Sequence, residues 1–454
     1  MSRAALIAAC CAGALLLVAP AVAQTPVSGR TVDAYPASLA FDAAGFALAS
    51  WTGLQGATAD AARPFVAVAK RKPGASWHAA PALPATITSH TVALDRTGRV
   101  ALATTRQTPL SRHRSRTSVV VNVATTGVLQ FARGVLIDSG PPRPVTAEGP
   151  QPTLALPKVA FVPADSIYVA WQRTYPRSRA GVWLAGVRRF NRAIPARRMA
   201  RGGGEPFLAF AADGSGVLAW RAGRRVVARL RTAAGHWTAA RTAATVPASM
   251  EIEHVALAVG PGRRSLVAVV ATRRAATGIR VRASVHSWVA GAGWRAGVLG
   301  EYTVQGSVSN SHVTGSGLRA LPLFESQGRM LVAWPRLVDG HVRASVTELA
   351  PEATGIGTRP ALDVSDPAFD ASIEDVAAGP DGRFAVAWFD LGDGRGSPSL
   401  SEVDATGAVT TTPRLATERA LVGAQVAYDP TSGRPTVVWS QGDPATGHQI
   451  VAMP

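Results

Sequence analysis

Cysteine is nearly absent from this sequence of 454 residues. The two cysteines, Cys10 and Cys11, both lie in an apolar segment at the N-terminus. If residues 1–23 are removed, the remaining chain has no disulfide, no thiol nucleophile and no thiolate ligand for a metal. A chain of this length can be held together by core burial alone.

The N-terminal segment has the pattern of a signal peptide. Arg3 precedes an apolar run, which is followed by the A-x-A sequence Ala21-Val22-Ala23. No later segment contains about 18 uninterrupted apolar residues, the length that would be needed to span a membrane. We therefore expect cleavage near Ala23-Gln24, a secreted or cell-envelope protein, and one domain over residues 24–454.

Several catalytic motifs are also missing. None of the three lysines follows a glycine, so there is no phosphate-binding GK sequence. There is no GxSxG elbow, and the nine histidines include no HxH or HExxH pair. These absences exclude P-loop NTPases, the common serine hydrolases and the common zinc hydrolases. We expect no cofactor.

The charge is distributed unevenly along the chain. Residues 24–300 carry 36 basic and 11 acidic side chains, whereas residues 301–454 carry 10 basic and 18 acidic ones. Almost all the cations are arginines, which suit carboxylate, phosphate or sulfate partners. Specific nucleic-acid binding is not expected, because no aromatic residues are interleaved with the basic ones for base stacking.

A short motif recurs eight times. It runs from small apolar residues through a tight turn, usually with glycine, into an apolar strand that mostly ends in Trp. The copies span residues 40–51, 93–104, 160–171, 209–220, 257–269, 323–334, 377–388 and 428–439. A spacing of about 50 residues is typical of a four-stranded propeller blade. We predict an all-β propeller of eight blades, or seven if the Trp-less unit at 93–104 or 257–269 is absorbed elsewhere.

The two ends of the chain predict how the ring closes. Only 15 residues follow Trp439, enough for one more strand, while residues 25–42 align without gaps on residues 412–429. We expect residues 25–32 to supply the outer strand of the last blade, which would hide an open sheet edge.

The turns of the second hairpins carry a family resemblance. Gly235-His236-Trp237 and Gly293-Trp294 resemble worn Asp-boxes, although the Asp is missing. The chain resembles secreted bacterial β-propellers with degenerate WD40-like or sialidase-like blades. Sialidase activity is not carried over, because the Arg triad, the Tyr nucleophile and the acid/base Asp of that family cannot be placed here.

Basic residues gather in two segments that we expect to be neighbouring loops on one face. The first is 105–117 and the second is 172–181. The candidate ligand-binding residues are Arg106, Arg112, His113, Arg114, Arg116, Arg173, Tyr175, Arg177 and Arg179.

An acidic set lies opposite in the seventh repeat. Its carboxylates offer oxygen ligands that suit Ca²⁺ or an acid/base role. The candidates are Asp363, Asp366, Asp370, Asp390 and Asp393.

These features lead to two functional hypotheses. The first is a monomeric, non-catalytic binding scaffold that recognises an anionic polysaccharide, another envelope polymer or a protein partner through its arginine-rich loops. The alternative is a divergent sialidase-like glycan hydrolase or lyase that uses the arginines for a sugar carboxylate.

Overall fold

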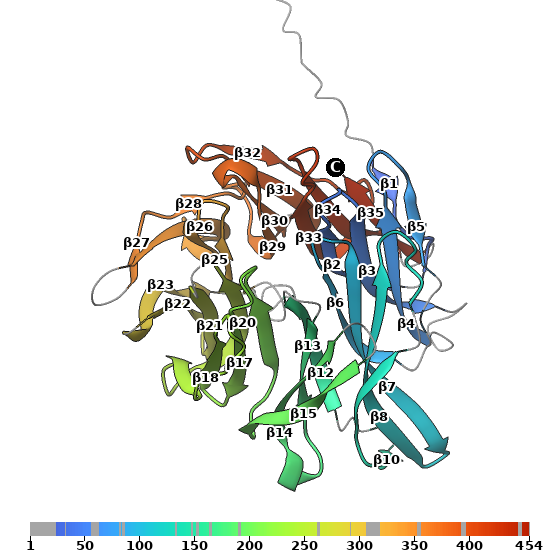
Figure 1. Ribbon diagram of the computed structural model, residues 1–454. Helices are drawn as coiled ribbons and strands as arrows, with labels where there is room; N and C mark the ends of the chain where they lie inside the picture. The colour runs from blue at the N-terminus through green and yellow to red at the C-terminus, as the bar shows by residue number, and fades with distance from the viewer. Residues whose placement is uncertain are drawn as a thin grey trace, which may run out of the picture.

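The computed structural model is a ring of eight β-sheets (Figure 1). It describes residues 24–453 except 32, 56–62, 81–82, 84–86, 132–133, 147–148, 151–153, 163–165, 189–191, 261–263, 291, 306–317, 352–355, 392–395 and 444–446. The expected signal peptide lies outside the described residues. In the part that is described, no helix is long and apolar enough to cross a membrane.

Each sheet is one blade of the propeller, and the strands of a blade follow one another along the chain. Blades one to four contain β2 (Asp33–Phe41), β3 (Ala47–Gln55), β4 (Arg63–Arg71) and β5 (Trp77–Ala79); β6 (Ile87–Leu94), β7 (Arg99–Ser111), β8 (Arg114–Thr125) and β9 (Val135–Ser139), with β10 (Arg143–Thr146) and β11 (Gly149–Pro150) attached; β12 (Leu154–Val162), β13 (Ser166–Arg173), β14 (Gly181–Arg188) and β15 (Arg192–Arg201); and β16 (Pro206–Phe210), β17 (Gly216–Ala222), β18 (Arg225–Arg231) and β19 (Arg241–Thr245).

Blades five to eight contain β20 (Glu251–Val259), β21 (Ser265–Ala275), β22 (Gly278–Val289) and β23 (Gly293–Gln305); β24 (Leu321–Phe324), β25 (Met330–Val338), β26 (His341–Pro351) and β27 (Ile356–Thr358), with β28 (Leu362–Asp363) attached; β29 (Ala371–Ala378), β30 (Phe384–Asp390), β31 (Ser397–Val403) and β32 (Val409–Thr412); and β33 (Ala420–Tyr428), β34 (Pro435–Asp443), β35 (Gly447–Met453) and β1 (Thr25–Pro26). Two short 3-10 turns are also present, η2 (Arg177–Arg179) and η4 (Pro380–Gly382).

The eightfold motif forms the two inner strands of every blade, as the sequence predicts. The motif glycines take a positive φ, for example 78° at Gly45, which a tight turn of this type requires. Asp42 supports that turn by accepting hydrogen bonds from the amides of Ala44 and Phe46. The strand after the turn is covered on both faces, and every residue of β30 is buried. The Trp-less units at 93–104 and 257–269 lie in the inner hairpins of blades two and five, so the propeller has eight blades.

The two ends of the chain close the ring in one blade, and this prediction is confirmed. Thr25 pairs with Ala452, and Pro26 pairs with Val451. Beyond the strand, the amide of Val27 donates to the carbonyl of Ile450 at 2.8 Å. The side chain of Val27 is 4% exposed, so it belongs to the core.

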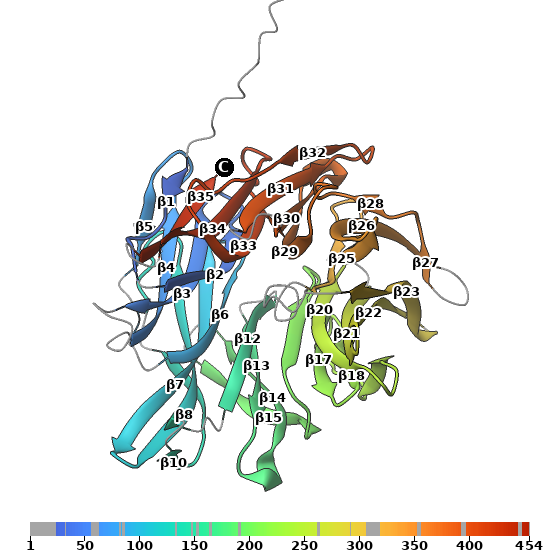
Figure 2. The same ribbon diagram turned by 180° about the vertical axis from the view of Figure 1, so that it is seen from behind.

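The blades present two different faces. The positive-φ turns of the inner hairpins lie on one face, which we call the lower face. On the opposite face, the inner strand of each blade begins and the second strand ends. We call this the upper face, and it also carries the connections between blades. In Figures 1 and 2, the inner strands β2, β6, β12, β20, β29 and β33 surround the middle of the ring.

Arginines fasten neighbouring blades together at the lower face. Arg264 of blade five donates to the carbonyl of Gly328 in blade six at 2.8 Å, and its guanidinium lies over the ring of Phe324. Arg329 of blade six repeats the contact with the carbonyl of Gly382 in blade seven at 2.7 Å. Each bond joins a side chain to the turn of the next blade, so the set stiffens the ring.

We expect Arg264→Ala to lower the free energy of unfolding by about 1 kcal/mol, because the Gly328 carbonyl loses a charged donor and Phe324 loses its cover. Chemical denaturation would measure the change. Arg192→Ala, at an exposed position of β15, is the matched control and should change stability by less than half as much. Equal effects would contradict a role in fastening the blades.

Candidate functional site

The predicted loop 105–117 is a β-hairpin. β7 continues to Ser111 and β8 begins at Arg114, so only two residues form the turn. The hairpin projects from the body of the ring (Figure 1), and Arg112, His113, Arg114 and Arg116 are exposed along it. Arg106 lies lower down, within β7, and donates to Oδ1 of Asn122 at 2.7 Å.

The predicted loop 172–181 lies in the neighbouring blade, as expected, but its residues have different roles. Arg173 is 2% exposed and forms an ion pair with Asp138 at 3.1 Å. The same Asp138 accepts the indole hydrogen bond of Trp171, so Arg173 is held within the protein. Tyr175 is exposed, and the guanidinium of Arg143 lies 4.4 Å from the centre of its ring.

The remaining two arginines of that segment lie in η2, and both are exposed. The guanidinium of Arg179 lies over the ring of Trp183. Blades two and three therefore both carry exposed arginines.

The acidic candidates that the structure describes are bound by neighbours in blades six and seven, and Asp363 belongs to β28 of blade six rather than to blade seven as predicted. Asp363 accepts two hydrogen bonds of 2.8 Å from Arg336, and Asp370 accepts one from the amide of Val342. Asp366 accepts from the amide of Ala368, and Asp390 is buried near Arg414. Asp393 lies outside the described residues.

These carboxylates do not assemble a cation site. Among the residues that the structure describes, no three His, Cys, Asp or Glu side chains gather closely enough to hold a metal ion.

A different set of charged residues converges at the upper face, and sequence reasoning missed it. Its members lie within the first five positions of three inner strands, β12, β20 and β29, or just before the inner strands β16 and β24, in five successive blades. We call this set the axial cluster: Lys158, Glu205, His254, Arg319, Glu374 and Asp375.

Ion pairs between blades connect the members of the axial cluster. Nζ of Lys158 in blade three lies 3.1 Å from Oε1 of Glu205 in blade four. Nη1 of Arg319 in blade six lies 3.3 Å from Oε2 of Glu374 in blade seven. His254 of blade five feels both cations, since Arg319 and Lys158 each contribute to its pKa. The five strands therefore bring their charges to one place.

A β-bulge places two consecutive carboxyl groups in blade seven. The pairing of β29 with β30 skips Glu374, between Ile373 and Asp375. Bulges of this kind redirect side chains and are common beside active sites. Oδ2 of Asp375 accepts the amide hydrogen of Val426 at 3.0 Å, which links blades seven and eight.

Burial changes the acidity of both carboxyl groups. It raises the pKa of Asp375 to about 7, against the opposing effects of two backbone hydrogen bonds and of Arg319. Burial also raises the pKa of Glu374, which Arg319 and the hydroxyl of Ser372 counteract. Within the described part of the chain, Oε2 of Glu374 receives no hydrogen bond. One carboxyl group is therefore poised to hold or release a proton near neutral pH.

His254 is kept neutral. Burial, with the nearby Arg319 and Lys158, lowers its pKa to about 3. Its Nδ1 is buried and has no hydrogen-bond partner in the parts of the chain that are described. A neutral imidazole of this kind is able to accept a proton or a hydrogen bond from a ligand.

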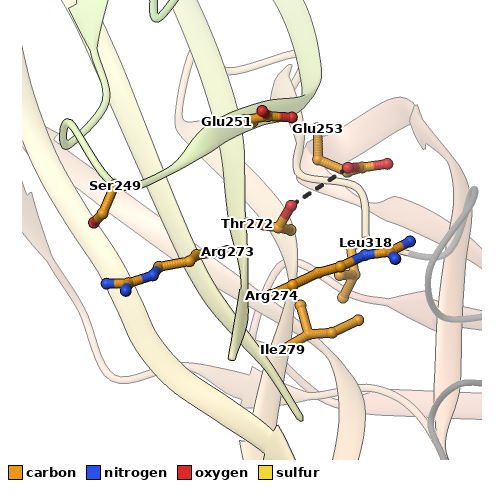
Figure 3. A pocket seen from close by; sticks show the side chains of 8 residues that line it. All are labelled: Ser249, Glu251, Glu253, Thr272, Arg273, Arg274, Ile279 and Leu318. Atoms are coloured by element: carbon orange, nitrogen blue, oxygen red, sulfur yellow. Dashed lines mark hydrogen bonds between the residues drawn. The ribbon is translucent and has the colours of Figure 1, made fainter. Parts of the chain in front are cut away.

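A cavity of about 420 Å³ opens beside the axial cluster. Figure 3 shows Glu253 and Thr272 turned toward each other, with a hydrogen bond of 3.4 Å from the hydroxyl to the carboxylate. Arg273 and Arg274 follow Thr272 and also line the cavity. Because Glu253 precedes His254, the strand β20 contributes to both the cavity and the cluster.

The sequence contains a signal for this site. Blades five and seven begin with Ile252-Glu253-His254-Val255 and Ile373-Glu374-Asp375-Val376, and in both the Glu is the bulged residue. Polar residues at these positions interrupt inner strands that are otherwise largely apolar. Aligning the blades from the start of the inner strand, rather than from the turn, would have exposed the pair.

No family model and no curated protein sequence matches this chain. The similar solved structures include the polysaccharide lyase Uly1, with 11% identity and a TM-score of 0.46 over 95% of this chain and 98% of that one. A PL25 ulvan lyase has 10% identity and a TM-score of 0.43 over 76% and 90%. An alpha-L-arabinanase from Penicillium chrysogenum has 11% identity and a TM-score of 0.42 over 84% and 97%.

At such identities the likeness is one of fold, and the WD40-like or sialidase-like character of the blades stays a prediction. Our first functional hypothesis, the non-catalytic scaffold, is given up. The similar structures named above are two polysaccharide lyases and an arabinanase, and the alternative, a glycan hydrolase or lyase, is taken up below as a proposal.

Proposed function

We propose that this protein cleaves an acidic polysaccharide at the axial cluster. The observation that carries the proposal is the pair of consecutive carboxyl groups that the bulge of β29 places beside Arg319, whose Nη1 lies 3.3 Å from Oε2 of Glu374. Burial supports it by raising the pKa of Asp375 to about 7. Carboxyl groups with raised pKa values serve as proton donors in the cleavage of glycosidic bonds.

The acidic nature of the substrate follows from the cations. Lys158 and Arg319 lie on either side of His254 along the ring, and Arg273 and Arg274 line the adjoining cavity. The basic excess of residues 24–300 favours approach of a polyanion over the whole upper face. A uronate carboxylate would be bound by Lys158 and Arg319.

The reaction that these groups support is hydrolysis. Asp375 donates its proton to the glycosidic oxygen as the bond from that oxygen to C1 breaks. A water molecule forms the new bond to C1, and Glu374, through the oxygen that receives no hydrogen bond from the described residues, accepts the proton that the water loses.

Elimination is a second candidate, and the neutral His254 favours it. Its imidazole would remove the proton on C5 of a uronate whose carboxylate is neutralised by Arg319 and Lys158. The electron pair forms a C4–C5 double bond, the C4–O bond breaks, and Asp375 protonates the departing oxygen. The unsaturated product absorbs ultraviolet light and the hydrolytic product does not, so one assay separates the two reactions.

We expect Lys158→Gln to raise KM for an acidic polysaccharide about tenfold with little change in kcat, because a charged hydrogen bond to the substrate is lost. Reducing-end and absorbance assays on polygalacturonate, alginate and hyaluronan would measure this, with neutral arabinan for comparison. Lys72→Gln, the same change at an exposed position away from the cluster, is the control and should have no effect. If the wild-type protein releases no product from any acidic polymer, the proposed function is wrong.

A further inference from the structure

A second cavity opens on the upper face, between blades one and two. Its volume is about 270 Å³. The start of β2, the end of β3 and the starts of β4 and β6 form its walls, through Tyr35, Thr52, Leu54, Phe65, Ile87 and Ser89. The corresponding ends of the strands of blade five surround the cavity beside the axial cluster, so both cavities open on the same face.

The two cavities lie across the ring from each other. One belongs to blades one and two, and the other to blade five and the segment that leads into blade six. In a ring of eight blades, blade one stands opposite blade five. A ligand that reaches both must pass over the middle of the ring, where the axial cluster lies.

The lining of the second cavity suits a sugar ring. Tyr35 is 43% exposed, which is unusual for an aromatic side chain on an inner strand. Phe65, Val66 and Ile87, which also line the cavity, are buried and apolar. The C–H face of a pyranose packs on an aromatic ring, while its hydroxyl groups need polar partners at the edge. Thr52 and Ser89 offer hydroxyl groups there.

Gly53 gives this floor its shape. A Cβ at this position would lie 2.8 Å from the ring of Phe65 and 2.3 Å from the carbonyl oxygen of Asp33. The glycine therefore lets the Phe65 ring lie close against β3, which keeps the space above it open.

The cavity is too small for an oligosaccharide. Pockets that enclose a whole drug-sized ligand measure about 300–1,000 Å³, so this one holds a single ring. Among the described residues that line it, none is basic. It therefore differs in chemistry from the charged cavity across the ring.

We propose that this cavity is a distal subsite that binds one sugar ring of a long chain while the axial cluster cleaves the chain elsewhere. The inference rests on the proposed function and adds to it the substrate class, an extended polymer that crosses the face rather than a short oligosaccharide. The protein then acts within chains and favours long ones.

Tyr35→Ala tests the subsite. We expect KM for long polygalacturonate to rise about tenfold, as the loss of a stacked aromatic ring implies, with the rate on a trisaccharide of the same sugar unchanged. Tyr175→Ala is the matched control, since Tyr175 is similarly exposed, at 39%, but belongs to blade three and does not line the cavity. Thermal unfolding of each variant would establish that both fold.

Binding without cleavage gives a separate readout. In affinity electrophoresis through gels containing polygalacturonate, Tyr35→Ala should be retarded less than the wild type, and Tyr175→Ala should be retarded equally. If Tyr35→Ala matches the wild type in retardation and in KM for the polymer, the subsite is wrong while the proposed cleavage stands. If the wild type cleaves nothing but its retardation depends on Tyr35, the subsite stands and the proposed cleavage fails.

Discussion

Replacing Asp375 with Asn should lower kcat on an acidic polysaccharide at least about 100-fold, the usual contribution of a positioned acid. The amide oxygen of Asn can still accept the hydrogen bond from Val426, so the link between blades seven and eight survives. The Asn side chain cannot donate a proton to the glycosidic oxygen. The initial rate at saturating substrate would measure the change in kcat.

Asp366→Asn is the control for this prediction. Asp366 belongs to the same repeat and was a candidate from the sequence, but it accepts a hydrogen bond from the amide of Ala368, which Asn can preserve. We expect wild-type rates. If Asp366→Asn is inactive and Asp375→Asn is active, the acid has been assigned to the wrong residue.

The pH dependence follows from the same pKa. Asp375 holds its proton below a pKa of about 7, so kcat should decline as the pH rises through that value. Stability also depends on this group: its pKa in the folded protein is raised above the unfolded value of 3.8, so the contribution of Asp375 to stability is fully present below about pH 4 and is lost as the pH rises toward 7. Asp375→Asn should therefore be more stable than the wild type at pH 8 and about equal to it at pH 4.

Removing residues 24–31 should lower the free energy of unfolding by about 3 kcal/mol or more and promote aggregation. The deletion empties the position of the buried Val27 and unpairs the outer edge of β35, including the bond from the Thr31 amide to the His448 carbonyl. An unpaired edge strand recruits other chains. Chemical denaturation and light scattering would measure the two effects.

A rearranged chain is the control for the deletion. Residues 24–31 are moved behind Pro454 through an Asn-Gly turn, which suits the antiparallel pairing of Thr25 with Ala452. Stability should return to nearly the wild-type value. If the deletion leaves the free energy of unfolding unchanged, β1 does not stabilise the last blade and the prediction is wrong.

Much of the fold was predictable because the repeat marks one turn per blade. A glycine at positive φ and a strand buried on both faces leave few alternatives, and Gly45 and its counterparts mark the turn of the inner hairpin in six of the eight blades. The pairing of residues 25–26 with β35 was also predictable, because the ends of the chain align on each other.

The site was not predictable in the same way. Arg173 and Asp363 stood out by charge, yet each forms an ion pair with a neighbour in its own blade or the adjacent one. Glu374 and Asp375 stood inside an apolar strand, where burial raises their pKa values and a bulge changes their direction. Sequence spacing does not reveal which face a bulged residue reaches, nor which blades meet at the axis.

The closing blade also determines when this protein can finish folding. During synthesis, residues 25–31 emerge more than 400 residues before their partners, residues 447–453. For that whole interval the first strand has no sheet to join, although the blades between can form one after another from local hairpins. Closing a loop of this length is slow compared with forming a hairpin. The final step should thus be a single late event that locks every blade at once.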